Sequence, residues 1–359
     1  MTSLDFAQKL STTHAIIKLY DTVTNYLDDP GVKAVSALFF DMTKAFDLVP
    51  HGRLLQKLYA QSTVNGGILP VGCLMWLSSY LCSRFQCVRI GSFVSKPVLA
   101  TSGVPQGSLL GPLLFIYFMN DLCLQNHPST FIKYADDTAV IVPIQTDFSE
   151  VNFVVEAVEK WCAENGMQLN ISKSKHVLLN KNLDLQDQSR PQPLIHCSSE
   201  VKYLGVTFSD KCSWILHFTK LHKKALQRMY CLRRLRTLLH RRHLILFYHT
   251  IIRGSIEYVS PAYHGSRTKI LDDIQAKCHK IICGKKCTCA CFPPLDYRSR
   301  IATLKLLKGI MEDQKNPLHL LVPPMLPSGR LAIPYCKTQR RLKTFMMTAS
   351  FLFNQEHKR

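Results

Sequence analysis

The chain has 359 residues, of which 47% are hydrophobic and 19% charged, so its composition excludes a disordered protein and allows about two or three domains. Lys and Arg number 45 against 25 Asp and Glu, and the net charge of +20 indicates a polyanionic partner, either nucleic acid or an anionic membrane surface. No apolar run approaches the roughly 20 residues that span a bilayer, and no secretory signal begins the chain, so we expect an intracellular protein of the nucleus or cytoplasm, not secreted and without a membrane partner.

Predicted helices and strands alternate along the first 210 residues. Apolar side chains recur at helical spacing over 6–29, and Asp29-Pro30-Gly31 ends that helix. Further elements are expected in this order: a strand and a helix within 33–60, a helix over 70–83, a β-hairpin over 85–98, a loop at 101–112 leading into an apolar helix, a hairpin at 131–142, a helix over 148–165, and strands near 176–180 and 201–208.

The character of the chain changes after residue 210. Between Lys211 and Ile256 there are eleven Lys or Arg and no Asp or Glu, with leucines at helical spacing, which predicts basic amphipathic helices. A charge run is usually a solvated helical face, but such faces normally mix both signs. Repeated prolines from Pro317 onward predict a loosely structured C-terminal segment with a frayed end.

Two adjacent carboxylates, Asp136 and Asp137, lie between apolar, β-favouring runs within 131–142, which predicts two strands joined by a tight turn. Asp is common in turns that have no further role. A third acid, Asp41, ends the apolar run 35–40. Acids at such a tip concentrate negative charge that cations offset, so the three together predict a divalent-metal site in a protein that binds polyanions.

Five ordered blocks of the sequence carry a resemblance. Phe40-Asp41-Met42-Thr43-Lys44-Ala45-Phe46-Asp47, Ser102-Gly103-Val104-Pro105-Gln106-Gly107-Ser108 and Tyr134-Ala135-Asp136-Asp137 resemble motifs A, B and C of reverse transcriptases. The likeness is specifically to those of non-LTR, LINE-type retrotransposons of the jockey kind. Residues 161–175 resemble motif D, and 202–206 resemble the primer grip. The resemblance covers nearly the whole chain.

The resemblance implies an α+β polymerase, with an antiparallel palm sheet backed by helices, partial fingers and a helical thumb. We expect the fingers remnant and palm in 1–210, a basic helical thumb in 211–315 and a Pro-rich C-terminal tail in 316–359. The basic fingers region and upstream endonuclease domain of such elements do not precede these motifs here. We interpret the sequence as an N-terminally truncated reading frame.

The implied activity is that of an RNA-directed DNA polymerase, a nucleotidyltransferase whose partners are an RNA template, a DNA primer and dNTPs. Two Mg²⁺ ions, or Mn²⁺ in their place, about 3.5–4 Å apart would clamp the attacking and leaving oxygens. Asp41 and Asp136 are the implied bridging ligands and Asp137 the third acid. Lys173 would protonate or neutralise the pyrophosphate, unless it is an ordinary surface charge. The alternative is an inactive nucleic-acid-binding relic of such an element; no protein partner is indicated.

Further residues take implied roles in nucleotide and primer binding. Phe46 would exclude a nucleotide 2′-hydroxyl, and its alternative role is that of a core aromatic. The loop that would approach the nucleotide, or else be a simple helix-entry turn, contains Gly103, Pro105, Gln106 and Gly107, with Tyr134 beside the acids. The primer grip, alternatively an ordinary hairpin, consists of Tyr203, Leu204 and Gly205.

The basic segment would contact phosphates of the template–primer duplex, giving affinity without sequence choice. The implied contacts are Lys220, Lys223, Lys224, Arg228, Arg233, Arg234 and Arg236. The fourteen cysteines are scattered, and we interpret most as small buried hydrophobes in a reducing compartment. One crowded group has a spacing that fits no common closed zinc motif, which makes zinc the less favoured interpretation. Its members are Cys278, His279, Cys283, Cys287, Cys289 and Cys291.

Overall fold

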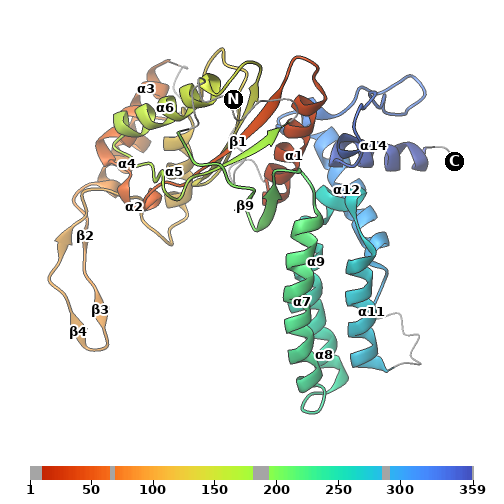
Figure 1. Cartoon of the computed structure of the whole chain (residues 1–359). Helices are drawn as coiled ribbons and strands as arrows, with labels where there is room; N and C mark the ends of the chain where they lie inside the picture. Colours follow the sequence, from red (N-terminus) through yellow and green to blue (C-terminus); the bar gives the residue numbers. More distant parts are fainter. Residues whose placement is uncertain (1–9, 65–68, 181–193, 285–291, 358–359) are drawn as a thin grey trace.

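The computed structural model describes residues 10–64, 69–180, 194–284 and 292–357 (Figure 1). A four-stranded antiparallel sheet lies at its centre, in the order β6-β7-β1-β8. The strands are β1 (Ala34–Phe40), β6 (Thr130–Tyr134), β7 (Asp137–Ile144) and β8 (Lys175–Asn180). Every residue of β1 is buried, as its uninterrupted run of small and apolar side chains requires in a central strand covered on both faces.

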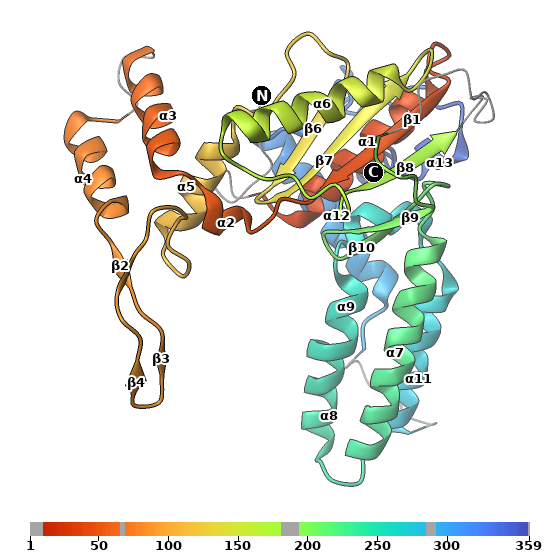
Figure 2. The same cartoon turned by 60° about the vertical axis from the view of Figure 1, so that its left-hand side comes forward.

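The two faces of the sheet are covered by different helices (Figure 2). Side chains of β1 alternate between two hydrophobic clusters, with Val35, Ala37 and Phe39 in one and Leu38 and Phe40 in the other. Helix α1 (Thr12–Asp28) packs on the first face. The second cluster gathers α2 (Ala45–Leu48), α3 (His51–Val64), α4 (Val71–Leu81), α5 (Leu110–Met119) and α6 (Ser149–Glu164). The predicted α+β architecture, a helix-backed antiparallel sheet, is confirmed.

A narrow ribbon projects from the end of α4 (Figures 1 and 2). It consists of β2 (Phe85–Gln86), β3 (Arg89–Ile90), β4 (Phe93–Val94) and β5 (Val98–Leu99). Phe85 pairs with Leu99 and Ile90 with Phe93, and the residues of these four short strands are exposed. The predicted hairpin over 85–98 is therefore confirmed.

A second hairpin leads from the sheet into a helical region. It is formed by β9 (Glu200–Tyr203) and β10 (Val206–Ser209). The elements that follow are α7 (Ile215–Leu235), α8 (Arg241–Phe247), the π-helix η2 (Tyr248–Arg253), α9 (Gly254–Glu257), α10 (Ser260–Tyr263), the 3₁₀-helix η3 (His264–Ser266), α11 (Lys269–Cys283) and α12 (Leu295–Glu312). Helices α7, α8 and α11 pack side by side and extend away from the sheet, as Figure 2 shows.

The C-terminal segment differs from its prediction. It contains the 3₁₀-helix η4 (His319–Leu321), α13 (Gln339–Leu342) and α14 (Phe345–Glu356). The expectation of a loosely structured tail over 316–359 is wrong for α14, because Phe345 and Phe353 are buried in the first cluster. The Asp28 carboxylate of α1 also accepts hydrogen bonds from the Lys337 amide at 3.2 Å and the Thr338 hydroxyl at 2.8 Å. The prolines end before this apolar run begins.

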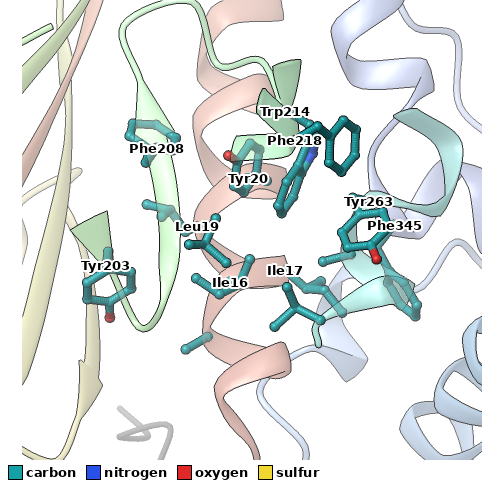
Figure 3. Packing of buried hydrophobic residues seen from close by; sticks show 14 of the residues in the cluster. Ile16, Ile17, Leu19, Tyr20, Tyr203, Phe208, Trp214, Phe218, Tyr263 and Phe345 are labelled. Atoms are coloured by element: carbon teal, nitrogen blue, oxygen red, sulfur yellow. The ribbon is translucent and has the colours of Figure 1, made fainter. Parts of the chain in front are cut away.

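One hydrophobic cluster joins α1, the β9–β10 hairpin, the basic helices and α14. Figure 3 shows its centre, where the Tyr20 ring stacks on Trp214 at a centroid distance of 4.4 Å. The change to a basic composition after residue 210 therefore occurs within one shared hydrophobic core. None of the helices in the described ranges is long and apolar enough to cross a bilayer. Residues 6–9, which the sequence predicts as the start of this first helix, lie outside the described residues.

Candidate active site

The sheet register brings two of the predicted acids together at the ends of the central strands β1 and β7, which form the acidic edge of the sheet. Phe40, the last residue of β1, lies opposite Thr138 of β7, so Asp41 and Asp137 occupy neighbouring strand ends. Asp137 also pairs with Tyr134 across the β6–β7 hairpin, which leaves Ala135 and Asp136 as its turn. Ala135 has a φ of 53°, the left-handed conformation that such tight turns use. All three acids are exposed.

The three carboxylates interact electrostatically. Partial burial raises the pKa of Asp137, and the negative charges of Asp136 and Asp41 raise it further. Within the described ranges, no three His, Cys, Asp or Glu side chains converge closely enough to form a metal site by themselves. The fold therefore concentrates negative charge at this edge without drawing the side chains into a closed cluster.

A cavity of about 320 Å³ opens beside the strand ends. Asp41, Asp137 and Lys173 line it, while Asp136 does not. The loop that carries Lys173 is fixed to the end of β1, because the Asn170 amide donates to the Asp41 carbonyl at 2.8 Å and the Asp41 amide donates to the Ser174 hydroxyl at 3.2 Å. Lys175 and Lys202 add two further cations to the cavity wall, and neither was predicted as a site residue.

The loop resembling motif B is locked to α2. The Gly103 amide donates to the Val49 carbonyl at 2.9 Å, and the Gln106 side-chain amide donates to the Asp47 carboxylate at 2.8 Å. Gly103 has a φ of 87°, and a Cβ there would lie 2.8 Å from the Asp47 carbonyl oxygen. Glycine is thus required by both conformation and space. Pro105, in the same loop, accepts a hydrogen bond from the Ser108 hydroxyl at 2.8 Å.

Phe46 precedes Asp47 on α2, and Gly107 follows Gln106 in the loop. The Phe46 ring stacks on Phe115 of α5, with centroids 4.2 Å apart, and its carbonyl accepts a hydrogen bond from the Val104 amide. This half-buried packing matches the alternative of a core aromatic, and exclusion of a 2′-hydroxyl stays a prediction. Gly107 has a φ of 79° and open space where a Cβ would be.

The hairpin resembling the primer grip is largely packed against the protein. Tyr203 is 4% exposed, and burial, with a smaller effect of the Asp137 charge, raises its pKa. Leu204 and Gly205 form the turn, both at positive φ. The Tyr258 hydroxyl donates to the Leu204 carbonyl at 2.8 Å and also lies 3.0 Å from the Thr12 hydroxyl. No sequence pattern singled out Tyr258.

The predicted phosphate contacts fall into two groups. Lys220 forms an ion pair with Glu200 at 2.7 Å, and Arg228 donates to the Ser255 hydroxyl at 2.7 Å, so both cations are used within the fold. The other five are exposed: Lys223, Lys224, Arg233 and Arg234 on α7, and Arg236 directly after its end. Arg233 and Arg236 line a cavity of about 540 Å³ that α11 also borders with two further lysines, Lys277 and Lys280.

The cysteine cluster is only partly visible. Cys278 is fully buried on α11, and burial raises the pKa of its thiol to about 12. Cys283 lies within 3.3 Å of the Arg241 guanidinium, and His279 packs edge-on against Phe292. Cys287, Cys289 and Cys291 lie outside the described residues. Cys278 thus has the environment of a core side chain.

Comparisons with known proteins agree with the motifs. The family model described as reverse transcriptase (RNA-dependent DNA polymerase) matches residues 7–208. The probable RNA-directed DNA polymerase from transposon BS of Drosophila melanogaster is 28% identical over 246 residues, which cover 64% of this chain and 26% of that protein. The RNA-directed DNA polymerase from mobile element jockey of the same species is 30% identical over 199 residues, or 52% of this chain and 21% of that protein. The chain therefore spans a minor part of each relative's length.

Two solved telomerase structures are also similar, both in complex with a TWJ fragment of telomeric RNA. The protein from Candida tropicalis matches 96% of this chain and 50% of that chain, with 11% identity and a TM-score of 0.46. The protein from Candida albicans matches 89% and 51%, with 13% identity and a TM-score of 0.44.

Proposed function

Because the chain belongs to the reverse transcriptase family, we propose that it acts as an RNA-directed DNA polymerase, adding deoxynucleotides to a DNA primer on an RNA template. The observation that carries the proposal is the β1–β7 register. It brings Asp41 and Asp137 to one sheet edge, beside a cavity that Lys173 also lines. The names of the two relatives support the choice of template and product.

The acidic edge suits magnesium by its chemistry. Carboxylate oxygens are ligands that Mg²⁺ and Mn²⁺ prefer. Burial, and then the charges of Asp136 and Asp41, raise the pKa of Asp137, and a bound cation would offset these charges. Asp41 and Asp137, on neighbouring strand ends, would hold two ions together with Asp136, and waters or nucleotide phosphates would complete the ligands that the three carboxylates do not supply by themselves. When bound, the metal supplies positive charge that stabilises the attacking and leaving oxygens.

The remaining residues bind and orient the reactants. Lys173 has an exposed ammonium on the cavity that Asp41 lines, so it would neutralise or protonate the departing pyrophosphate. The loop of Gly103 and Gln106 would hold the nucleotide, and its bonds to α2 fix the backbone in advance, which lowers the entropic cost of orientation. Phe46, on α2, would contact the sugar of the nucleotide and exclude a 2′-hydroxyl.

The basic helices would hold the template–primer duplex. Four exposed cations on α7, and Arg236 directly after its end, are available for phosphate contacts. Each contact made should steepen the salt dependence of binding, by about 0.9 in the slope of log K against log salt. Tyr203, Leu204 and Gly205 would contact the primer end chiefly through the backbone of their turn, because the Tyr203 side chain is buried.

A primer-extension assay tests the proposal. The protein is given an RNA template, a DNA primer, dNTPs and Mg²⁺, and duplex binding is measured on the same samples. Asp136→Asn should abolish synthesis while duplex binding persists. The charge-matched control is Asp273→Asn, at an exposed position of α11, which should extend the primer as the wild type does.

The assay also separates the second candidate function. Wild-type protein that binds the duplex in a salt-sensitive manner but extends no primer would contradict the polymerase proposal. That result would identify a nucleic-acid-binding protein without polymerase activity.

A further inference from the structure

A second polar cavity, of about 470 Å³, lies at the base of the helical region. Its wall is formed by α1, the connection from β10 to α7, the connection from η3 to α11, and α13. It shares no lining residue with the cavity beside Asp41 and Asp137. Whatever binds here therefore does so apart from the acidic edge.

The charges on this wall have one sign. Lys211, Arg267, Arg340 and Lys343 line the cavity, and no Asp or Glu does so in the part of the chain that the structure describes. Arg267 is held by ion pairs with two carboxylates, including Asp296 at 3.0 Å. Lys211, Arg340 and Lys343 are exposed and form no ion pair within the described ranges. Three cations are thus free to meet an anion.

Two hydroxyl groups on the same wall have no hydrogen-bond partner. The oxygens of Tyr20 and Thr268 are buried, and no described group accepts or donates a bond to either. Leaving a buried hydroxyl unpaired is unfavourable, so a ligand that pairs with both hydroxyls is favoured. Tyr20 is 4% exposed, and its ring is fixed against Trp214, as Figure 3 shows.

The Tyr20 hydroxyl is a donor at neutral pH. Burial raises its pKa well above the ordinary value, and the nearby Cys212 thiol raises it further. Cys212 and Tyr20 both line the cavity. A protonated hydroxyl can donate its hydrogen to an anionic oxygen.

The N-terminus of α11 adds a third feature. Thr268 is the N-cap of this helix of 15 residues, yet its hydroxyl makes no capping hydrogen bond. Helix N-termini carry partial positive charge and favour anions. The unused hydroxyl and the helix end therefore lie on the same cavity wall as the free cations.

We propose that this cavity binds a phosphate group, through Lys211, Arg340 and Lys343 together with the hydroxyls of Tyr20 and Thr268. Phosphate oxygens accept hydrogen bonds from hydroxyls and from cationic side chains alike, which matches this mixed wall. The group can belong to the backbone of a nucleic acid or to a small phosphorylated molecule. The inference does not depend on polymerase activity, because the cavity is separate from the acidic edge.

Thermal unfolding with inorganic pyrophosphate, in buffer containing EDTA, tests the site. A ligand that binds only the folded protein raises Tm with its concentration. The double variant Arg340→Gln/Lys343→Gln should lose most of the Tm rise. The matched double variant Arg89→Gln/Lys96→Gln also removes one Arg and one Lys, from exposed positions of the β2–β5 ribbon, and should retain it. Equal losses in the two double variants would overturn the proposal.

Tyr20→Phe gives an independent readout. Removing an unpaired hydroxyl should leave Tm without pyrophosphate unchanged or slightly higher, so a folding defect is not expected. The rise in Tm at a fixed pyrophosphate concentration should fall clearly below that of the wild type. A Tyr20→Phe variant with the full wild-type rise would contradict the assignment of the hydroxyl.

Binding of a single-stranded RNA oligonucleotide distinguishes the two sources of phosphate. If the group belongs to nucleic acid, pyrophosphate should compete with RNA, and Arg340→Gln/Lys343→Gln should weaken RNA binding several-fold more than Arg89→Gln/Lys96→Gln. If both double variants weaken RNA equally and only the first loses the pyrophosphate response, the ligand is a small phosphorylated molecule. Both results support a phosphate site, whereas no pyrophosphate response in the wild type refutes it.

Discussion

Replacing Gly103 by alanine should destabilise the protein more than the same change at Gly107, although both glycines have similar backbone conformations. Their φ angles are 87° and 79°. Alanine in this left-handed region costs about 1–2 kcal/mol at either position. The positions differ in their neighbours, since nothing lies within 4 Å of a Cβ at Gly107, while three Asp47 backbone atoms lie within 3.1 Å of one at Gly103.

The additional loss at Gly103 follows from the contacts that must move. The Asp47 backbone cannot yield without disturbing the bond from the Gly103 amide to Val49 and the bond from the Ser102 hydroxyl to the Asp47 carbonyl at 3.0 Å. Each such hydrogen bond contributes about 0.5–1.5 kcal/mol. We therefore expect Gly107→Ala to lower the free energy of unfolding by about 1–2 kcal/mol and Gly103→Ala by about 2–5 kcal/mol.

Urea unfolding followed by circular dichroism measures both variants. The midpoint should shift more for Gly103→Ala, with an unchanged slope, because the native fold and the unfolded chain are otherwise the same. Where synthesis is detectable, Gly103→Ala should also raise KM for dNTPs, since it displaces the loop that contacts α2. Equal losses of stability in the two variants would refute the claimed contact with Asp47.

Three further predictions concern charge and packing. Burial raises the pKa of Asp21 from 3.8 to about 7, so ionisation of its carboxyl lowers the free energy of unfolding as pH rises through this interval. Asp21→Asn should therefore raise stability at pH 8, by at most about 4 kcal/mol, and hardly at pH 4. An equal effect at both pH values in thermal unfolding would contradict this. Phe345→Ala should cost about 3–5 kcal/mol in urea unfolding, because the ring is buried, and a loss below 1 kcal/mol would mean that α14 does not pack as described. Lys223→Ala should reduce the salt slope of duplex binding by about 0.9 and Lys220→Ala by less, since Lys220 is paired with Glu200; equal reductions would show that the pair does not persist.

The sequence predicted the elements whose periodicity is strong. The helices now seen as α4 and α6 and the hairpin carrying Asp136 and Asp137 are where the apolar patterns indicated. The family resemblance drawn from motifs A, B and C is confirmed by the match over 7–208. These features depend on local spacing or on a distinctive string, and both can be read along a single chain.

Features that depend on distant contacts were not predicted. The Pro-rich segment gave no local signal for α14, which packs mainly on α12 and also on α1, more than 300 positions earlier in the chain. The Asp28 carboxylate of α1 likewise meets Thr338, the N-cap of α13, across 310 positions. Lys277 and Lys280 join the cations of α7 only because α11 folds back along it. Lys202 lines the cavity beside Asp41 through the β9–β10 hairpin, which no spacing rule connects to β1.

The Tyr258 hydroxyl connects α1 to the β9–β10 turn. It lies at a junction of three segments, within hydrogen-bonding distance of Thr12 at the start of α1 and of the Leu204 carbonyl in the β9–β10 turn. A swing of the long helices about their base would reach this hairpin through the Tyr258 hydroxyl as well as through the Lys220–Glu200 ion pair between α7 and β9. If that turn holds a primer end as proposed, the spacing between sheet and helices is coupled to the position of that end, and Tyr258→Phe would weaken the linkage without emptying the core.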